Sequence, residues 1–245
     1  MHLFHCATDQ PDIVAPVSTI FTPLGTVQFQ ATIREEIVSS RTPSAIYRLV
    51  NSGWAAGWYD KAFDLELLVC RPTLPTSFEH IPDALNWDCW AGIWRLQSHE
   101  PVAASVFAAV WEEDYTWHNW TTDSGQFVYA KTWDNGQTQV TIGTQDTECL
   151  ALRAEQRDYM PEQLREYFCK IPSSYDWRTC PYWKQEAHER LREIGVPTPL
   201  PPLPSNQLCQ LHFVVAWANH DNQSQLTWLS IDRNPIDILM GAGCL

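Results

Sequence analysis

The 245-residue chain has few basic side chains and no long apolar run. Sixteen Lys and Arg residues stand against 29 Asp and Glu residues, which gives a formal net charge of −13. A field of this sign repels phosphate backbones and anionic membrane surfaces, so we expect no nucleic acid and no membrane partner. No stretch approaches the roughly 18 consecutive apolar residues that a membrane-spanning helix needs. The charge favours a basic protein as the partner.

Signatures of export, metal binding and cofactor binding are also missing. Residues 1–6 contain neither the basic nor the apolar stretch of an export signal, so we expect a soluble, cytoplasmic protein. The eight cysteines are irregularly spaced, and in that compartment we expect reduced thiols rather than disulfides. No spacing matches a zinc motif, a phosphate-binding loop, a dinucleotide-binding loop or a nucleophile elbow. We therefore expect no metal and no cofactor, and we assign no catalytic residue.

Tryptophan is what the chain has in abundance. Nine of its 13 tryptophans lie between Trp54 and Trp133. An indole ring offers a large apolar face and one N–H donor, which suits a packed core and a binding surface equally. Within Trp111–Trp120, four aromatic residues alternate with six polar ones. Because an unpaired polar group costs roughly 1–3 kcal/mol in a core, this mixture is unusual for a core. A tryptophan-rich core is still the favoured interpretation of the rings, and a functional surface is the alternative.

The candidate binding residues are the aromatic, acidic and histidine side chains of this segment and one later tryptophan: Trp111, Glu112, Glu113, Asp114, Trp117, His118, Trp120 and Trp133. We expect an interaction protein that binds a basic protein through them, as an inhibitor or an immunity protein would. One alternative is a protein that binds a small ligand or a glycan on the aromatic rings. The other is a hydrolase that uses the carboxylates near 112–118, although adjacent residues of a strand point to opposite faces.

Residue patterns predict a mostly antiparallel sheet. Apolar and polar residues alternate over Val27–Arg34 and Phe63–Leu67, as half-buried strands require. Trp90–Leu96 fits a strand or one face of a helix, and we favour the strand. The turn residues Asp134-Asn135-Gly136 predict a hairpin. With it, we expect Val102–Thr144 to form an antiparallel meander of three or four strands.

Three helices and a second hairpin complete the prediction. Apolar residues on one face and suitable end residues predict helices at Pro43–Ser52, Met160–Ile171 and Pro181–Ile194. The five prolines of 196–204 predict an extended spacer. Beyond it, Gln207–Trp217 and Gln225–Asp232 read as a hairpin. We therefore expect a single α+β domain, 1–245, in which a mostly antiparallel sheet carries a few helices around 160–195 and the spacer precedes the C-terminal hairpin.

Overall fold

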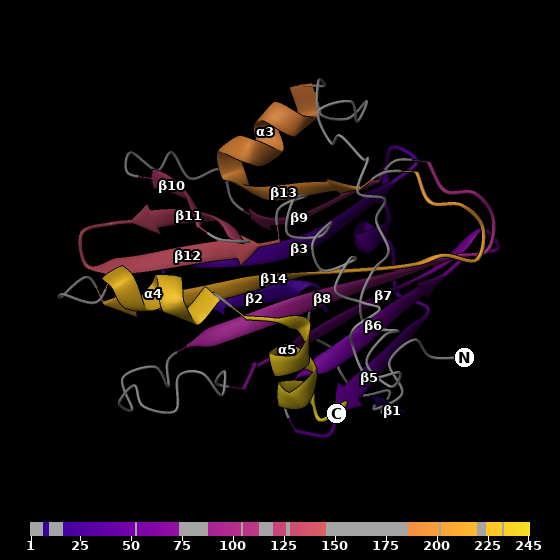
Figure 1. Cartoon of the computed structure of the whole chain (residues 1–245), viewed down its shortest axis with the longest axis horizontal. Coiled ribbons are helices and arrows are strands. Elements are labelled where there is room, and N and C mark those ends of the chain that lie inside the picture. Colours follow the sequence, from indigo (N-terminus) through magenta and orange to yellow (C-terminus); the bar gives the residue numbers. More distant parts are fainter. Residues whose placement is uncertain are drawn as a thin grey trace.

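A computed structural model describes residues 7–9, 17–51, 53–73, 88–103, 105–112, 120–125, 128–145, 186–200, 202–219, 224–231 and 233–245. This part of the chain is mostly antiparallel β-sheet with a few short helices, and it is largely a β-sandwich (Figure 1). No helix within it is long and apolar enough to cross a membrane.

The larger of the two sheets, here the large sheet, has nine strands among the described residues. In spatial order they are β1 (Ala7–Asp9), β5 (Ala45–Leu49), β6 (Trp54–Tyr59), β7 (Phe63–Cys70), β8 (Cys89–Ser98), β14 (Leu208–Asn219), β12 (Thr138–Thr144), β11 (Val128–Asp134) and β10 (Trp120–Gly125). Each strand pairs antiparallel with its neighbours.

The small sheet packs against one face of the large sheet. Its path consists of β13 (Gly195–Leu200), β9 (Ser105–Trp111), β3 (Gly25–Ile33) and β2 (Thr19–Thr22), and β4 (Glu36–Ile37) pairs with β3 beside the short 3₁₀ turn Val38–Ser40. The strict alternation predicted for β3 is visible in its burial, because every second side chain enters the interface between the sheets.

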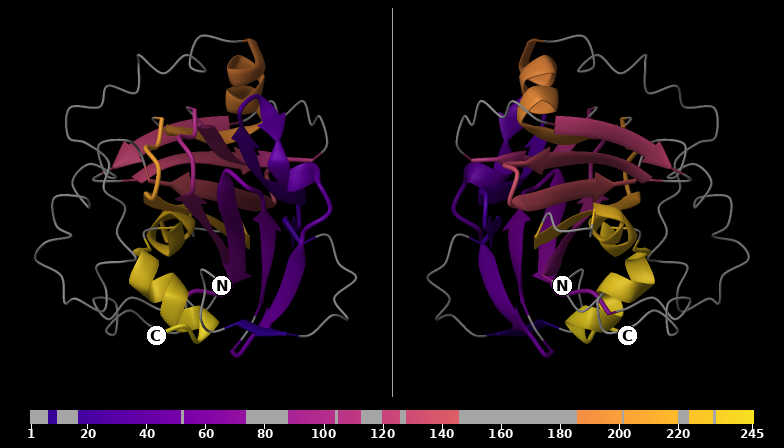
Figure 2. Two further views of the ribbon diagram at one scale, coloured as in Figure 1. Left: turned by 90° about the vertical axis from the view of Figure 1, so that its right-hand side faces the viewer. Right: turned by 90° about the vertical axis from the view of Figure 1, so that its left-hand side faces the viewer.

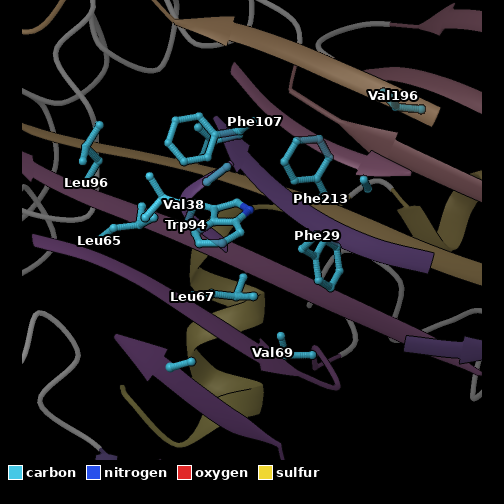
Figure 3. Packing of buried hydrophobic residues seen from close by; sticks show 14 of the residues in the cluster. Phe29, Val38, Leu65, Leu67, Val69, Trp94, Leu96, Phe107, Val196 and Phe213 are labelled. Carbon is cyan, nitrogen blue, oxygen red and sulfur yellow. The ribbon is translucent and has the colours of Figure 1, made fainter. Parts of the chain in front are cut away.

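The main core lies between the two sheets. Figure 3 shows Trp94 and Phe213 of the large sheet beside Phe29 and Phe107 of the small sheet. The Trp94 and Phe107 ring centroids are 5.7 Å apart, and those of Phe29 and Phe213 are 6.3 Å apart. Gly92 of β8 permits this approach, since a Cβ atom there would lie 2.8 Å from the Phe29 ring.

A second, smaller core lies on the opposite face of the large sheet. Two helices cover part of this face, α4 (Ser224–Ile231) over β12 and β14 and α5 (Pro235–Ala242) over β7 and β8 (Figures 1 and 2). Alternation along β8 places Trp94 in the core between the sheets and Ile93 in the core under the helices. The central strands are therefore buried on both faces.

The residues at the N-terminal end of α5 explain why the helix begins there. Asn234 accepts a hydrogen bond from the Asp237 backbone, and the Asp237 carboxylate accepts one from the Asn234 backbone. Pro235 occupies the first turn, where its missing N–H removes no intrahelical bond. This reciprocal capping fixes the start of α5, although the segment was not among the predicted helices.

The predicted helix at Pro43–Ser52 is wrong, because β5 occupies Ala45–Leu49. The apolar residues at 45, 46, 49 and 50 satisfy a helical period, yet β5 pairs with β6 on one side and β1 on the other. Pairing on two sides outweighs a short local pattern, because Ile46 and Tyr47 are also residues that suit a strand.

The predicted spacer at 196–204 is also wrong over its first half, which forms β13 against β9. Pro197 and Pro199 are two residues apart, so their nitrogens face the same side of the strand. Among the described residues β13 ends the small sheet, and the prolines can face the edge while alternate residues donate to β9. Two of the five prolines therefore lie in an edge strand here rather than in an unpaired linker.

The remaining elements agree with the prediction in part. The strands predicted at Val27–Arg34, Phe63–Leu67 and Trp90–Leu96 are present as β3, β7 and β8. Of the Val102–Thr144 meander, β10, β11 and β12 are neighbours, but β9 lies in the small sheet.

At the C-terminal side, β14 is the predicted strand, but Gln225–Asp232 is not its hairpin partner, because α4 occupies Ser224–Ile231. The helix α3 (Glu186–Ile194) confirms the C-terminal part of the helix predicted at Pro181–Ile194. The helix predicted at Met160–Ile171 lies outside the described residues.

The cysteines depart from the expectation of reduced thiols at one position. Cys70, Cys89 and Cys209 are buried and form no disulfide, as expected. Cys244 is disulfide-bonded, and its partner lies outside the described residues. Within those residues, no group of three or more His, Cys, Asp or Glu side chains could hold a metal ion.

Candidate functional site

The predicted binding surface loses two of its rings, because Trp111 and Trp133 lie in the core between the sheets. Trp111 of β9 is 2% exposed and Trp133 of β11 is fully buried. Their ring centroids are 5.5 Å apart in an edge-to-face arrangement that links the two sheets. The polar residues beside them gave a misleading signal, since Glu112 follows Trp111 and is exposed where β9 ends.

The other predicted residues are not placed. Glu113, Asp114, Trp117 and His118 lie outside the described residues, and of Trp120 only the backbone in β10 is described. The protein-binding surface, the glycan platform and the hydrolase carboxylates near 112–118 therefore stay predictions for the segment between β9 and β10.

A different set of polar side chains comes together on the helix-bearing face of the large sheet. Tyr59 (β6), Glu66 (β7), Arg95 (β8) and Gln210 (β14) come from four successive strands, and we call these four residues the polar row. Glu66 is directly opposite Arg95, and Arg95 is directly opposite Gln210. The exposed fractions of Glu66, Arg95 and Gln210 are 1%, 2% and 4%, whereas Tyr59 is 36% exposed.

Hydrogen bonds join members of the row in two pairs. The Tyr59 hydroxyl donates to Oε1 of Glu66 over 2.5 Å, and Nε of Arg95 donates to Oε1 of Gln210 over 2.7 Å. The hydroxyl of Tyr47, from β5, lies 3.1 Å from the Tyr59 hydroxyl. Because Tyr59 gives its single proton to Glu66, Tyr47 is the donor in that contact. A directed chain therefore runs from Tyr47 through Tyr59 to the Glu66 carboxylate.

Gly57 makes this chain possible. It lies opposite Glu66 in the register, and a Cβ atom at this position would be 2.4 Å from the Tyr59 hydroxyl oxygen. Without a side chain at 57, the Tyr59 ring folds back over the sheet and its hydroxyl reaches the next strand. The absence of a side chain at Gly57 therefore leaves the space that the Tyr59 ring occupies above the sheet.

The electrostatics of the row keep Tyr59 protonated. Burial raises the pKa of the Tyr59 hydroxyl, and its hydrogen bonds to Glu66 and Tyr47 raise this pKa further. At neutral pH the residue is therefore a hydrogen-bond donor and not a base. Glu66 and Arg95 supply one negative and one positive charge that face each other across two strands.

His212 continues the polar surface along β14. It follows Gln210 by two residues, so its side chain lies on the same face, and it is buried. Its Nε2 atom lies 2.8 Å from the backbone oxygen of Arg233, in the connection between α4 and α5. A carbonyl oxygen only accepts, so this nitrogen carries the proton. His212 thereby ties the helical connection to the strand.

Sequence reasoning missed the polar row because its members are far apart in the chain. Only the strand order brings residues 59, 66, 95 and 210 together. One signal was available: Leu67-Leu68-Val69-Cys70 is apolar at consecutive positions, which indicates a strand buried on both faces. A glutamate inside such a strand must be buried, and a buried carboxylate needs partners.

Comparisons with known proteins add little to this geometry. No family model matches the chain, and no curated protein matches it. Among solved structures, a chain named "Putative kojibiose phosphorylase from human microbiome" aligns with 10% sequence identity and a TM-score of 0.44. The alignment covers 96% of this chain but 29% of that one. A likeness at this level carries no argument about activity, and the site is judged on its own residues.

Proposed function

We propose that the protein binds a small polar ligand at the polar row, and that the ligand enters at Tyr59. The observation that carries this proposal is the convergence of four hydrogen-bonding side chains from successive strands on one patch of a sheet face. Three of them are buried, and the fourth reaches solvent. Sites for small ligands combine a mostly apolar lining with a few polar groups in fixed positions, which is the composition of this face.

Energetics support a role beyond folding. Moving a carboxylate and a guanidinium out of water costs several kcal/mol per ion by general estimates, and well-packed apolar residues stabilise a fold equally well or better. The same face shows such apolar packing at the next inward-facing positions of the two strands, Leu68 on β7 and Ile93 on β8. Because apolar side chains could fill these positions at lower cost, we assign the charges of Glu66 and Arg95 to ligand recognition.

The hydrogen bonds define which ligand groups fit. The Tyr59 oxygen donates once and accepts once within the protein, so it can accept one further hydrogen bond. A ligand hydroxyl or N–H group suits this position, because a ligand carbonyl would find no proton available. We therefore expect a solute that carries hydroxyl or amine groups.

A ligand screen by thermal unfolding tests this proposal. We expect compounds with hydroxyl or amine groups to raise the unfolding temperature of the wild-type protein and to lose this effect with Tyr59→Phe. Tyr129→Phe is the matched control, since it removes a phenolic hydroxyl from β11 on the opposite face of the sheet. Hits that stabilise Tyr59→Phe as strongly as wild type would remove the proposal, as would a screen without hits.

A second candidate is the interaction protein expected from the sequence. The net charge of −13 and the exposed Glu112 at the end of β9 favour it. It predicts capture of a basic protein with an affinity that falls as salt rises and falls again with Trp117→Ala. Salt-independent capture would contradict it.

A further inference from the structure

Arg233 is a buried cation in the connection between α4 and α5. It is 3% exposed, and its backbone oxygen is held by His212 of β14. Within the described part of the chain, its Nε and Nη1 atoms are buried and have no hydrogen-bond partner. No ion pair joins it to a carboxylate among the same residues. A guanidinium in this setting has lost its water without receiving a counter-charge from the residues that the structure describes.

The nearest groups do not neutralise it. Cys89 of β8 makes a side-chain hydrogen bond with Arg233, but burial raises the pKa of this thiol to about 11. The thiol is therefore neutral at pH 7, and it uses its own proton towards the backbone oxygen of Ser230 over 3.5 Å. The Ser230 hydroxyl oxygen is itself buried and has no partner among the described residues. Nε and Nη1 of Arg233 and the hydroxyl of Ser230 therefore remain as buried donors without a hydrogen-bond partner among the described residues, in the layer between helices and sheet.

Arg71 is a neighbouring cation whose charge is compensated within the protein and by solvent. It also acts on Cys89, but its side chain is 55% exposed. It lies 3.6 Å from the Asp88 carboxylate and 5.3 Å from the centroid of the Trp90 ring. An exposed position, a carboxylate and an aromatic face therefore compensate Arg71, whereas Arg233 is buried and forms no ion pair with a carboxylate among the described residues.

We propose that Arg233 binds a small oxyanion, a phosphate or a carboxylate group, in the layer between α4, α5 and β8, with the Ser230 hydroxyl as a further donor. A planar guanidinium and a hydroxyl are the donors that recognise such groups. This site is separate from the polar row, so it does not depend on the proposed small-ligand function.

Thermal unfolding in different salts tests the site. We expect inorganic phosphate or acetate to raise the unfolding temperature of the wild-type protein by about 5 °C at saturation, compared with sodium chloride at the same ionic strength. A stronger response to phosphate indicates a phosphoryl group as the natural ligand, and a stronger response to acetate indicates a carboxylate. A wild-type protein that responds equally to all three salts overturns the proposal.

Variants distinguish binding from a general salt effect. Arg233→Met should lose the anion-specific shift and should be no less stable than wild type without phosphate or acetate, because it removes an uncompensated charge. Ser230→Ala should lower the affinity for the anion about fivefold. Arg71→Met is the matched control and should keep the full shift. An Arg233→Met protein that still responds, or that fails to fold without the anion, shows that Arg233 has a structural role and contradicts the proposal.

Discussion

The two faces of the large sheet differ in what they bury. The face towards the small sheet buries aromatic and aliphatic side chains, including Trp94, Trp133 and Phe213. The opposite face buries apolar residues under α4 and α5 but charged and polar residues at the polar row. Side chains that alternate along the central strands therefore form an apolar core on one side and include buried polar and charged groups on the other.

The difference shows that burial alone does not identify a core. The predicted surface includes Trp111 and Trp133 because acidic residues follow Trp111 in the sequence, yet the two rings join the two sheets. Glu66 and Arg95 lie within apolar strands and are as buried as those tryptophans. The large sheet therefore contains two kinds of buried residue, and substitutions should separate them.

The largest effect is expected from the face between the sheets. Trp94→Ala removes a ring that packs against Trp58 and Phe107, and it should lower the free energy of unfolding by about 4 kcal/mol. Denaturant unfolding measures this change. Phe21→Ala is the control, because Phe21 is 70% exposed and its loss should change stability by less than about 0.5 kcal/mol. Equal effects for the two variants would contradict the assignment of this core.

The second effect comes from removing one charge of the polar row. Glu66→Leu leaves the Arg95 guanidinium buried without the carboxylate opposite it, and stability should fall by about 3 kcal/mol. Asp64→Leu is the matched control on the same strand and face. Asp64 lies 3.1 Å from Nε2 of His99 in a more exposed pair, so its loss should cost less than about 1 kcal/mol. If both substitutions lower the free energy of unfolding equally, Glu66 does not compensate the buried charge of Arg95.

A smaller effect is expected at Gly57. Gly57→Ala should push the Tyr59 hydroxyl away from Glu66 and cost about 1 kcal/mol for the lost hydrogen bond. Tyr59→Phe removes the same bond, so combining the two substitutions should add little to either alone. Double-mutant cycles in urea measure the coupling. Strict additivity would show that the glycine does not act through Tyr59.

The last expected effect is a pH dependence on the side of the large sheet that faces the small sheet. Lys131 of β11 donates to the backbone oxygens of Arg192 and Glu193 at the end of α3, and burial lowers its pKa to about 8. Between pH 8 and the ordinary lysine value the unfolded chain binds more protons, so stability should rise with pH there. The Lys131 contribution to the slope is at most about 1.4 kcal/mol per pH unit.

Two variants isolate this slope. Lys131→Met and Lys131→Arg do not titrate in the window, so each should lack the Lys131 contribution when unfolding is measured from pH 7 to pH 10. The arginine variant also keeps a positive charge near the α3 carbonyls. A slope that survives in both variants belongs to other groups, and burial of Lys131 would then not control it.

The sequence predicts elements whose signal is local. Alternation in β3 and β7 and the turn residues between β11 and β12 identify strands that the structure contains. The sequence misleads where pairing with neighbouring strands determines the structure. Ile46 and Tyr47 suit a helix or a strand, and pairing of β5 with β1 and β6 selects the strand. Pro197 and Pro199 suggest a linker, but pairing with β9 makes this segment the strand β13. The polar row depends on the order β6-β7-β8-β14, which no local pattern encodes.

One double substitution tests most directly whether the polar row serves binding rather than folding. The change Glu66→Leu with Arg95→Met replaces both opposed charges by apolar side chains of similar size. We predict that this protein is at least as stable as wild type in denaturant unfolding, and that it no longer responds to ligands that stabilise wild type. A loss of about 3 kcal/mol or more in the double variant, equal to that of Glu66→Leu alone, would show that the row holds the fold together and would contradict the account.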